Sequence, residues 1–209
     1  MFSLQKLLGK EDKFFDLLEA SADEGRASVQ ALIRLTRTPD PTKSLDDFIL
    51  SRRKEKRIAA EISEALIMTF VTALEREDIE ALSLALYKIP KTVEKIGERI
   101  LIAPHFVAGI DMSRQLAMIE KAVGTLSTML KELRKGVNIE HMRAHNEQLQ
   151  VIEGEADKTV LELLRDLYSG TQEPLRAMFL QELYELLEQV TDRCRDAGNV
   201  MMHIVLKNS

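Results

Sequence analysis

The sequence predicts an all-α protein, an elongated bundle of six helices. The chain has 209 residues, of which 45% are hydrophobic and only nine are Gly and five are Pro. Apolar residues recur at spacings of three and four along almost its whole length, which is the helical period. Such a chain can bury a large core but has too few turn residues for an all-β protein. We therefore expect one helical domain that covers residues 1–209.

Five short stretches rich in helix-breaking residues separate the six helices in order. A Pro, Gly or small polar residue occurs in most of these stretches, where a helix cannot easily continue. The breaks are "RTPDPTKS" (37–44), "VTAL" (71–74), "APHFVAG" (103–109), "KGVN" (135–138) and "SGTQEP" (169–174).

Two helix starts carry local signals. Thr72 and Glu75 have the spacing of a capping box, in which two side chains satisfy free amides of the first helical turn. Pro174 stands where a proline is tolerated in a first turn, because the amide it lacks would have no helical partner there. We expect the third and sixth helices to begin at these positions.

The two halves of the chain share one pattern. An offset of 101 residues pairs Leu82 with Leu183 and Gly97 with Gly198, and it also superposes the turns. The pattern predicts two three-helix repeats, about residues 1–104 and 105–209. Each repeat alone would leave an apolar stripe uncovered, so we expect both to pack into one bundle.

Charge and motifs exclude several classes of function. The formal charge of −5, with basic residues scattered among acidic ones, argues against nucleic-acid binding. The start "MFSLQKLLGK" has no apolar core of a secretory signal, and no apolar run approaches the ~20 residues of a membrane helix. We expect a cytoplasmic protein without direct membrane insertion. No glycine-rich phosphate loop or nucleophile motif is visible, so we expect no enzyme.

Two pairs of carboxylates form the candidate site. Glu153 and Asp157, within "IEGEADKT", are four residues apart, as are Glu188 and Asp192. Residues at this spacing share a helix face, and two facing pairs would offer oxygen ligands to a metal ion such as Mg, Mn, Fe or Zn. The alternative is a solvated acidic surface, because Glu188 and Asp192 lie away from the apolar stripe of their helix.

Four longer segments resemble a known family. They are "KFFDLLE", "FVTALERED", "EGEAD" and the closing "LLEQVTDRCRDAGNVMMHIVLKNS". Together they resemble the PhoU-like accessory proteins of Pit-type, low-affinity phosphate transporters, over nearly the whole chain. The resemblance implies two three-helix PhoU-like repeats, a membrane phosphate transporter as partner, and acidic motifs that bind a divalent or trivalent metal ion (Fe, Zn, Mn, Mg or Ni).

The first half departs from the acidic pattern of this family. The positions equivalent to the four carboxylates are Arg52, Lys56, Tyr87 and Lys91. Basic and aromatic side chains cannot replace carboxylate ligands near neutral pH, so only the second half is expected to hold metal. Glu155 and Asp196 are candidate outer members of that site.

We therefore expect an accessory or regulatory protein of inorganic phosphate transport. It would act in the cytoplasm, at the inner face of the membrane through its transporter, and form a homo-oligomer. The alternative is a metal-free structural helical adaptor or oligomerisation module.

Overall fold

The computed structural model describes residues 4–37, 45–72, 74–136, 138–170 and 172–208. Within these ranges every regular element is a helix and no strand occurs. The helices are α1 (Leu4–Arg37), α2 (Asp46–Met68), α3 (Arg76–Ile102), the short α4 (Pro104–Val107), α5 (Ser113–Lys135), α6 (Ile139–Leu167) and α7 (Pro174–Lys207). The predicted all-α class with six long helices is confirmed, and the additional α4 lies inside the predicted break at 103–109.

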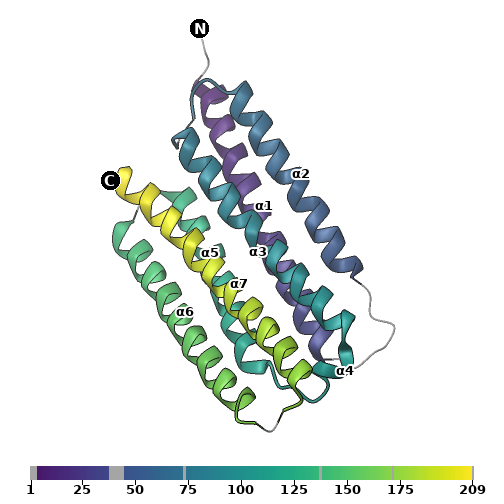
Figure 1. Ribbon diagram of the computed structural model, residues 1–209. Helices are drawn as coiled ribbons and strands as arrows, with labels where there is room; N and C mark the ends of the chain where they lie inside the picture. The colour runs from purple at the N-terminus through teal and green to yellow at the C-terminus, as the bar shows by residue number, and fades with distance from the viewer. Residues whose placement is uncertain (1–3, 38–44, 73, 137, 171, 209) are drawn as a thin grey trace.

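The six long helices run up and down in an elongated bundle (Figure 1). Helices α1, α2 and α3 pack against one another, and so do α5, α6 and α7. The two groups meet where α3 contacts α7 and where α1 contacts α5. The buried apolar residues of both groups form one core cluster. The division into two repeats stays a prediction, but each half does contribute three mutually packed helices.

Helix α7 illustrates why these residues form a buried helix. Its fully buried side chains recur every three or four residues, a spacing that places them on one side of an α-helix. They are Leu183, Leu187, Val190, Cys194, Ala197, Met201 and Ile204. Because α3, α5 and α6 all contact α7, this helix lies at the centre of the fold.

Only one of the two predicted helix starts is confirmed. Helix α7 begins at Pro174, with the Glu173 carboxylate accepting hydrogen bonds from the Leu175 and Arg176 amides. The capping box at Thr72 was wrong, because α3 begins at Arg76 and has no side-chain cap.

The start of α3 is held by contacts from a distant part of the chain. The Glu75 carboxylate is paired with Lys207 at the end of α7, at 3.0 Å between Oε2 and Nζ. Arg76 Nη1 donates a hydrogen bond of 2.9 Å to the Leu66 carbonyl. These contacts join the start of α3 to α2 and to the end of α7.

The close approach of α6 and α7 depends on a glycine. Gly198 is buried, and a Cβ built on it would lie less than 3.0 Å from Leu149 Cδ1 and 3.0 Å from Asn146 Oδ1. The two helix backbones can therefore come this near only because position 198 has no side chain. This contact lies nearly two turns beyond Asp192, the nearer of the two candidate carboxylates of α7.

Candidate functional site

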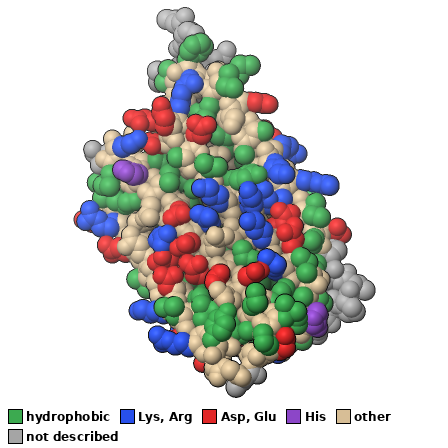
Figure 2. Space-filling model, viewed as in Figure 1, with side chains coloured by type: hydrophobic (Ala, Val, Ile, Leu, Met, Phe, Trp, Pro, Cys, Tyr) green, Lys and Arg blue, Asp and Glu red, His purple; other side chains and the backbone are tan. Residues whose placement is uncertain are grey.

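The four predicted carboxylates lie together on facing turns of α6 and α7. Glu153 lies near Asp192, and Glu188 lies near Asp157, close enough across the two helices for these charges to act on one another. The negative charges of Glu153 and Asp192 also act on Glu188. Acidic side chains gather over α6 and α7 in the space-filling view, next to basic side chains over α3 (Figure 2). The structure thus places the four residues near one another, and their role as metal ligands stays a prediction.

Burial and mutual repulsion change how these carboxyl groups titrate. Partial burial, followed by the charges of Asp192, Asp157 and Glu153, raises the pKa of Glu188 to about 7. Burial also raises the pKa of Glu153, against the opposing effect of Arg195. Neighbouring carboxylates disfavour one another's ionised form, so the cluster retains a proton more readily than isolated acids do.

Arg195 supplies a cation to this cluster from within α7. Its Nη1 forms ion pairs with Glu153 and, at 3.0 Å, with Asp192 Oδ1. Its Nη2 lies 3.2 Å from Asp196 Oδ1. The side chain is 28% exposed, so the guanidinium lies at the edge of the bundle and not in its core. Sequence reasoning missed Arg195, although "DRCRD" places it one turn from Asp192 on the same helix.

The donor chemistry of the cluster fits a hard metal ion, because all four side chains offer carboxylate oxygens. The arrangement does not yet fit one. Among the described residues, no group of three or more His, Cys, Asp and Glu side chains is placed so that it could hold a metal ion. Arg195 engages two of the four proposed ligands. The metal site therefore stays a prediction that requires these side chains to rearrange.

The equivalent place in the first half holds a buried arginine. Arg52 is 6% exposed, and its Nε lies 3.2 Å from Glu94 Oε2. Its Nη2 donates a 2.8 Å hydrogen bond to the Tyr87 hydroxyl, and the guanidinium stacks over the Tyr87 ring at 4.4 Å. Lys56 and Lys91 are exposed. This half therefore joins α2 to α3 with an ion pair and a cation–π contact.

Glu55 is the most deeply buried acid of the described chain that lies near Arg52. Its side chain is fully buried and accepts a 2.7 Å hydrogen bond from Ser21 Oγ on α1. Its second carboxylate oxygen has no protein partner. Desolvation raises the pKa of Glu55 to about 7, opposed by Ser21 and Arg52. Neither the family resemblance nor the periodicity singled out this residue.

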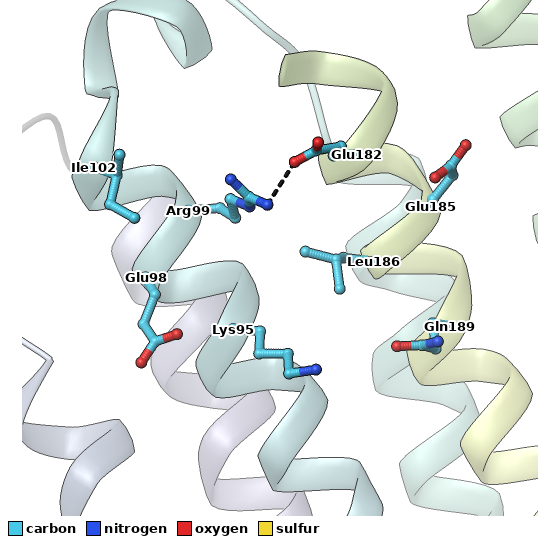
Figure 3. Close-up of a pocket in the computed structure, with 8 residues that line it drawn as sticks. All are labelled: Lys95, Glu98, Arg99, Ile102, Glu182, Glu185, Leu186 and Gln189. Carbon is cyan, nitrogen blue, oxygen red and sulfur yellow. Dashed lines mark ion pairs between the residues drawn. The ribbon is translucent and has the colours of Figure 1, made fainter. Parts of the chain in front are cut away.

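A surface cleft of about 490 Å³ separates α3 from α7 and contains none of the four predicted ligands (Figure 3). Arg99 Nη2 and Glu182 Oε2 form an ion pair across it, at 2.5 Å. The charge of Arg99 is thus balanced by Glu182, while Lys95 is a second basic residue in the lining of the cleft. Its lining residues are Lys95, Glu98, Arg99, Ile102, Glu182, Glu185, Leu186 and Gln189.

Two other side chains with chemically reactive groups have structural contacts of their own. Cys194 is fully buried, and this burial raises the pKa of its thiol, so it behaves as a core residue. His145 Nε2 lies 3.5 Å from Glu132 Oε1, which ties α6 to α5.

The chain is similar to known proteins in both sequence and structure. No family model matches the chain. Over 214 residues the chain is 28% identical to a provisionally named pit accessory protein of Rhizobium meliloti (strain 1021), covering 98% of this chain and 97% of the relative. The YkaA protein of Bacillus subtilis (strain 168) is 22% identical over 209 residues, covering 96% of this chain and 98% of the relative.

Two solved structures have the same fold as this chain. Two crystal structures of PhoU-like proteins from Shewanella oneidensis MR-1 superpose with a TM-score of 0.74 at 20% identity. Each match covers 93% of this chain and 99% of the other. The chain has a PhoU-like fold. The resemblance predicted from the four sequence segments is thus confirmed, and it extends over nearly the whole chain.

One remaining finding concerns membranes. In the described parts of the chain, no helix combines the length and apolar character that a membrane span requires.

Proposed function

We propose that this chain is an accessory or regulatory protein of inorganic phosphate transport, which acts by binding a membrane phosphate transporter. The observation that carries the proposal is the near full-length similarity to a relative named as a pit accessory protein. The PhoU-like fold agrees with this but supports only the fold. We place the protein in the cytoplasm, at the inner face of the membrane when it is bound, and we expect it to form a homo-oligomer.

The proposed role is not enzymatic. It draws support from the burial of Cys194, the single thiol, which leaves that nucleophile out of reach of a substrate. Association with a partner needs neither a nucleophile nor a phosphate loop.

A metal ion forms a second part of the proposal. Glu153 and Asp157 of α6 would hold it together with Glu188 and Asp192 of α7. A bound divalent or trivalent ion (Fe, Zn, Mn, Mg or Ni) would supply positive charge that links the two helices. The support is the convergence of these four carboxylates, together with the raised pKa of Glu188, which results first from burial and then from the charges of its acidic neighbours.

The alternative is a metal-free helical adaptor or oligomerisation module. The observation that favours it is the ion pairing of Arg195 with Glu153 and Asp192, which already provides a cation. The two possibilities differ in metal content, which can be measured directly.

The transporter proposal is tested by purification and by uptake. The tagged full-length chain should co-purify from solubilised membranes with a phosphate carrier, and deletion of its gene should change phosphate uptake by the cell. A tagged unrelated helical protein serves as the control for nonspecific capture. Unchanged uptake together with the absence of a carrier would contradict the proposal.

The metal proposal has its own test. Elemental analysis of the purified wild type is compared with the variant that carries E153Q, D157N, E188Q and D192N. These substitutions keep the side-chain shapes but remove the charges, so bound metal should be lost while the helical content is retained. Equal metal content in the two proteins would refute the site and leave the metal-free module.

A further inference from the structure

We propose that Arg195 is the resident cation of the acidic cluster, so that a metal ion binds there only by displacing its guanidinium. This inference rests on the metal part of the proposed function and is independent of any transporter. It assigns to Arg195 a role as an internal competitor.

The first support is the geometry of the guanidinium among the proposed ligands. Its Nη1 contacts both Glu153 on α6 and Asp192 on α7, and its Nη2 contacts Asp196. Arginine is charged at all accessible pH values and donates from a planar fork to carboxylate oxygens. Those oxygens are the ones that a metal ion bound between the helices would require. Arg195 and a metal ion therefore contend for the same oxygen atoms.

The second support is a charge-reversed copy of this contact in the first half. Position 52 lies 101 residues before Glu153, and position 94 lies 101 residues before Arg195. In the first half the arginine stands at 52 and the glutamate at 94, and they pair at 3.2 Å. Equivalent positions thus join α2 to α3 and α6 to α7 by an Arg–Glu contact, with the signs exchanged.

The exchanged positions of arginine and glutamate in the two halves indicate the role of Arg195. In the first half the pair links two helices in a setting where Lys56, Tyr87 and Lys91 replace the other carboxylates. Arg52 balances the negative charge of Glu94 there, so no metal ion is needed for that purpose. The same device in the second half neutralises Glu153, whose surroundings keep additional carboxylates. The second half therefore contains an Arg–Glu ion pair like that of the first half, and it also keeps carboxylates that the first half lacks.

The position of Arg195 also permits its displacement. The side chain is 28% exposed, so it can swing into water without opening the core. Arg193 provides a matched control because it lies half a turn away on α7 and pairs with Asp196, at 3.5 Å between Nη1 and Oδ2. Removing Arg193 changes the net charge by the same amount as removing Arg195, yet it leaves the pairs with Glu153 and Asp192 in place.

The test is titration of the chelator-treated full-length protein with Mn²⁺, following the free ion by electron paramagnetic resonance. Arg195→Gln should bind Mn²⁺ at least about tenfold more tightly than the wild type, because a like charge a few ångströms from the ion is removed. Arg193→Gln should stay within about threefold of the wild type, since more distant exposed charges are screened. Arg195→Met provides a second variant, and circular dichroism checks that each protein folds.

The location of the gained site is checked with the double variant Arg195→Gln and Asp157→Asn, which should lose the gain. Equal affinity of the wild type and both Arg195 variants overturns the proposal, whether that affinity is measurable or absent. An equal gain in Arg193→Gln also overturns it, because net charge would then suffice. None of these results depends on phosphate uptake or on co-purification.

Discussion

Gly198 allows a sharp test of how α6 and α7 are held at the distance that brings the carboxylates together. We expect Gly198→Ala to destabilise the protein, since its new methyl group would lie too close to Leu149 Cδ1 and Asn146 Oδ1. Neither neighbour can move freely. Leu149 is 1% exposed, and Asn146 Nδ2 donates a 3.1 Å hydrogen bond to Asn199.

The magnitude follows from two opposing effects. Replacing a helical glycine by alanine favours the helix by up to about 1 kcal/mol. Overpacking a close contact costs about 1–3 kcal/mol. Gly154 separates these effects, because it lies within α6 and a Cβ there would meet nothing within 4 Å. Gly154→Ala should therefore show only the gain, and it should exceed Gly198→Ala in the free energy of unfolding by about 1–3 kcal/mol.

Urea unfolding followed by circular dichroism at 222 nm measures this difference in both variants and in the wild type. Comparable slopes of the unfolding free energy against urea would show that the unfolded states are similar. The reasoning fails if Gly198→Ala is as stable as Gly154→Ala. That outcome would mean that α6 and α7 can separate at no cost, and the close approach would then not fix the acidic cluster.

Three further predictions concern the core. The folded pKa of Glu55, about 7, exceeds its ordinary value of 4.5, so its contribution to stability is full below pH 4.5 and is lost as the pH rises through 7. Between pH 5 and pH 8 the wild type should lose about 2.5 kcal/mol of its free energy of unfolding through Glu55, and Glu55→Gln should abolish this loss in urea unfolding. An unchanged pH dependence would contradict the assignment. Cys194 should not react with a thiol reagent in the native protein but should react in urea, because its side chain is fully buried; rapid native labelling would contradict this. Leu183→Ala, at a position that is 0% exposed, should lower the free energy of unfolding by about 2–5 kcal/mol in the same urea assay, whereas the exposed Leu84→Ala should lower it by much less.

The sequence could predict the helices because their signal is repeated many times along each one. The buried residues of α7 recur at helical spacing over its whole length, so an error at one position would not change the prediction. A helix end depends on only a few contacts, so its position is harder to predict. Pro174 predicts a helix start because a proline is tolerated in a first turn, whereas Glu75 forms an ion pair with Lys207, which is distant in sequence.

The candidate site was predicted in part for a similar reason. The spacing of Glu153 and Asp157, with that of Glu188 and Asp192, was enough to place four acids on two helix faces. The role of Arg195 depends on how α6 and α7 are rotated about their axes, which spacing within one helix does not fix. Comparing the halves for opposite charges could have indicated it, because Arg52 and Glu94 correspond to Glu153 and Arg195.

The central place of α7 has a consequence for biosynthesis. A ribosome makes this helix after the other six, yet α3, α4, α5 and α6 all pack against it. Until α7 emerges, the nascent chain exposes the apolar faces that this helix later covers, and such faces are prone to aggregation. The first three helices can associate early, because they contact one another. Synthesis that stops before residue 174 should therefore yield a chain that chaperones retain and proteases remove.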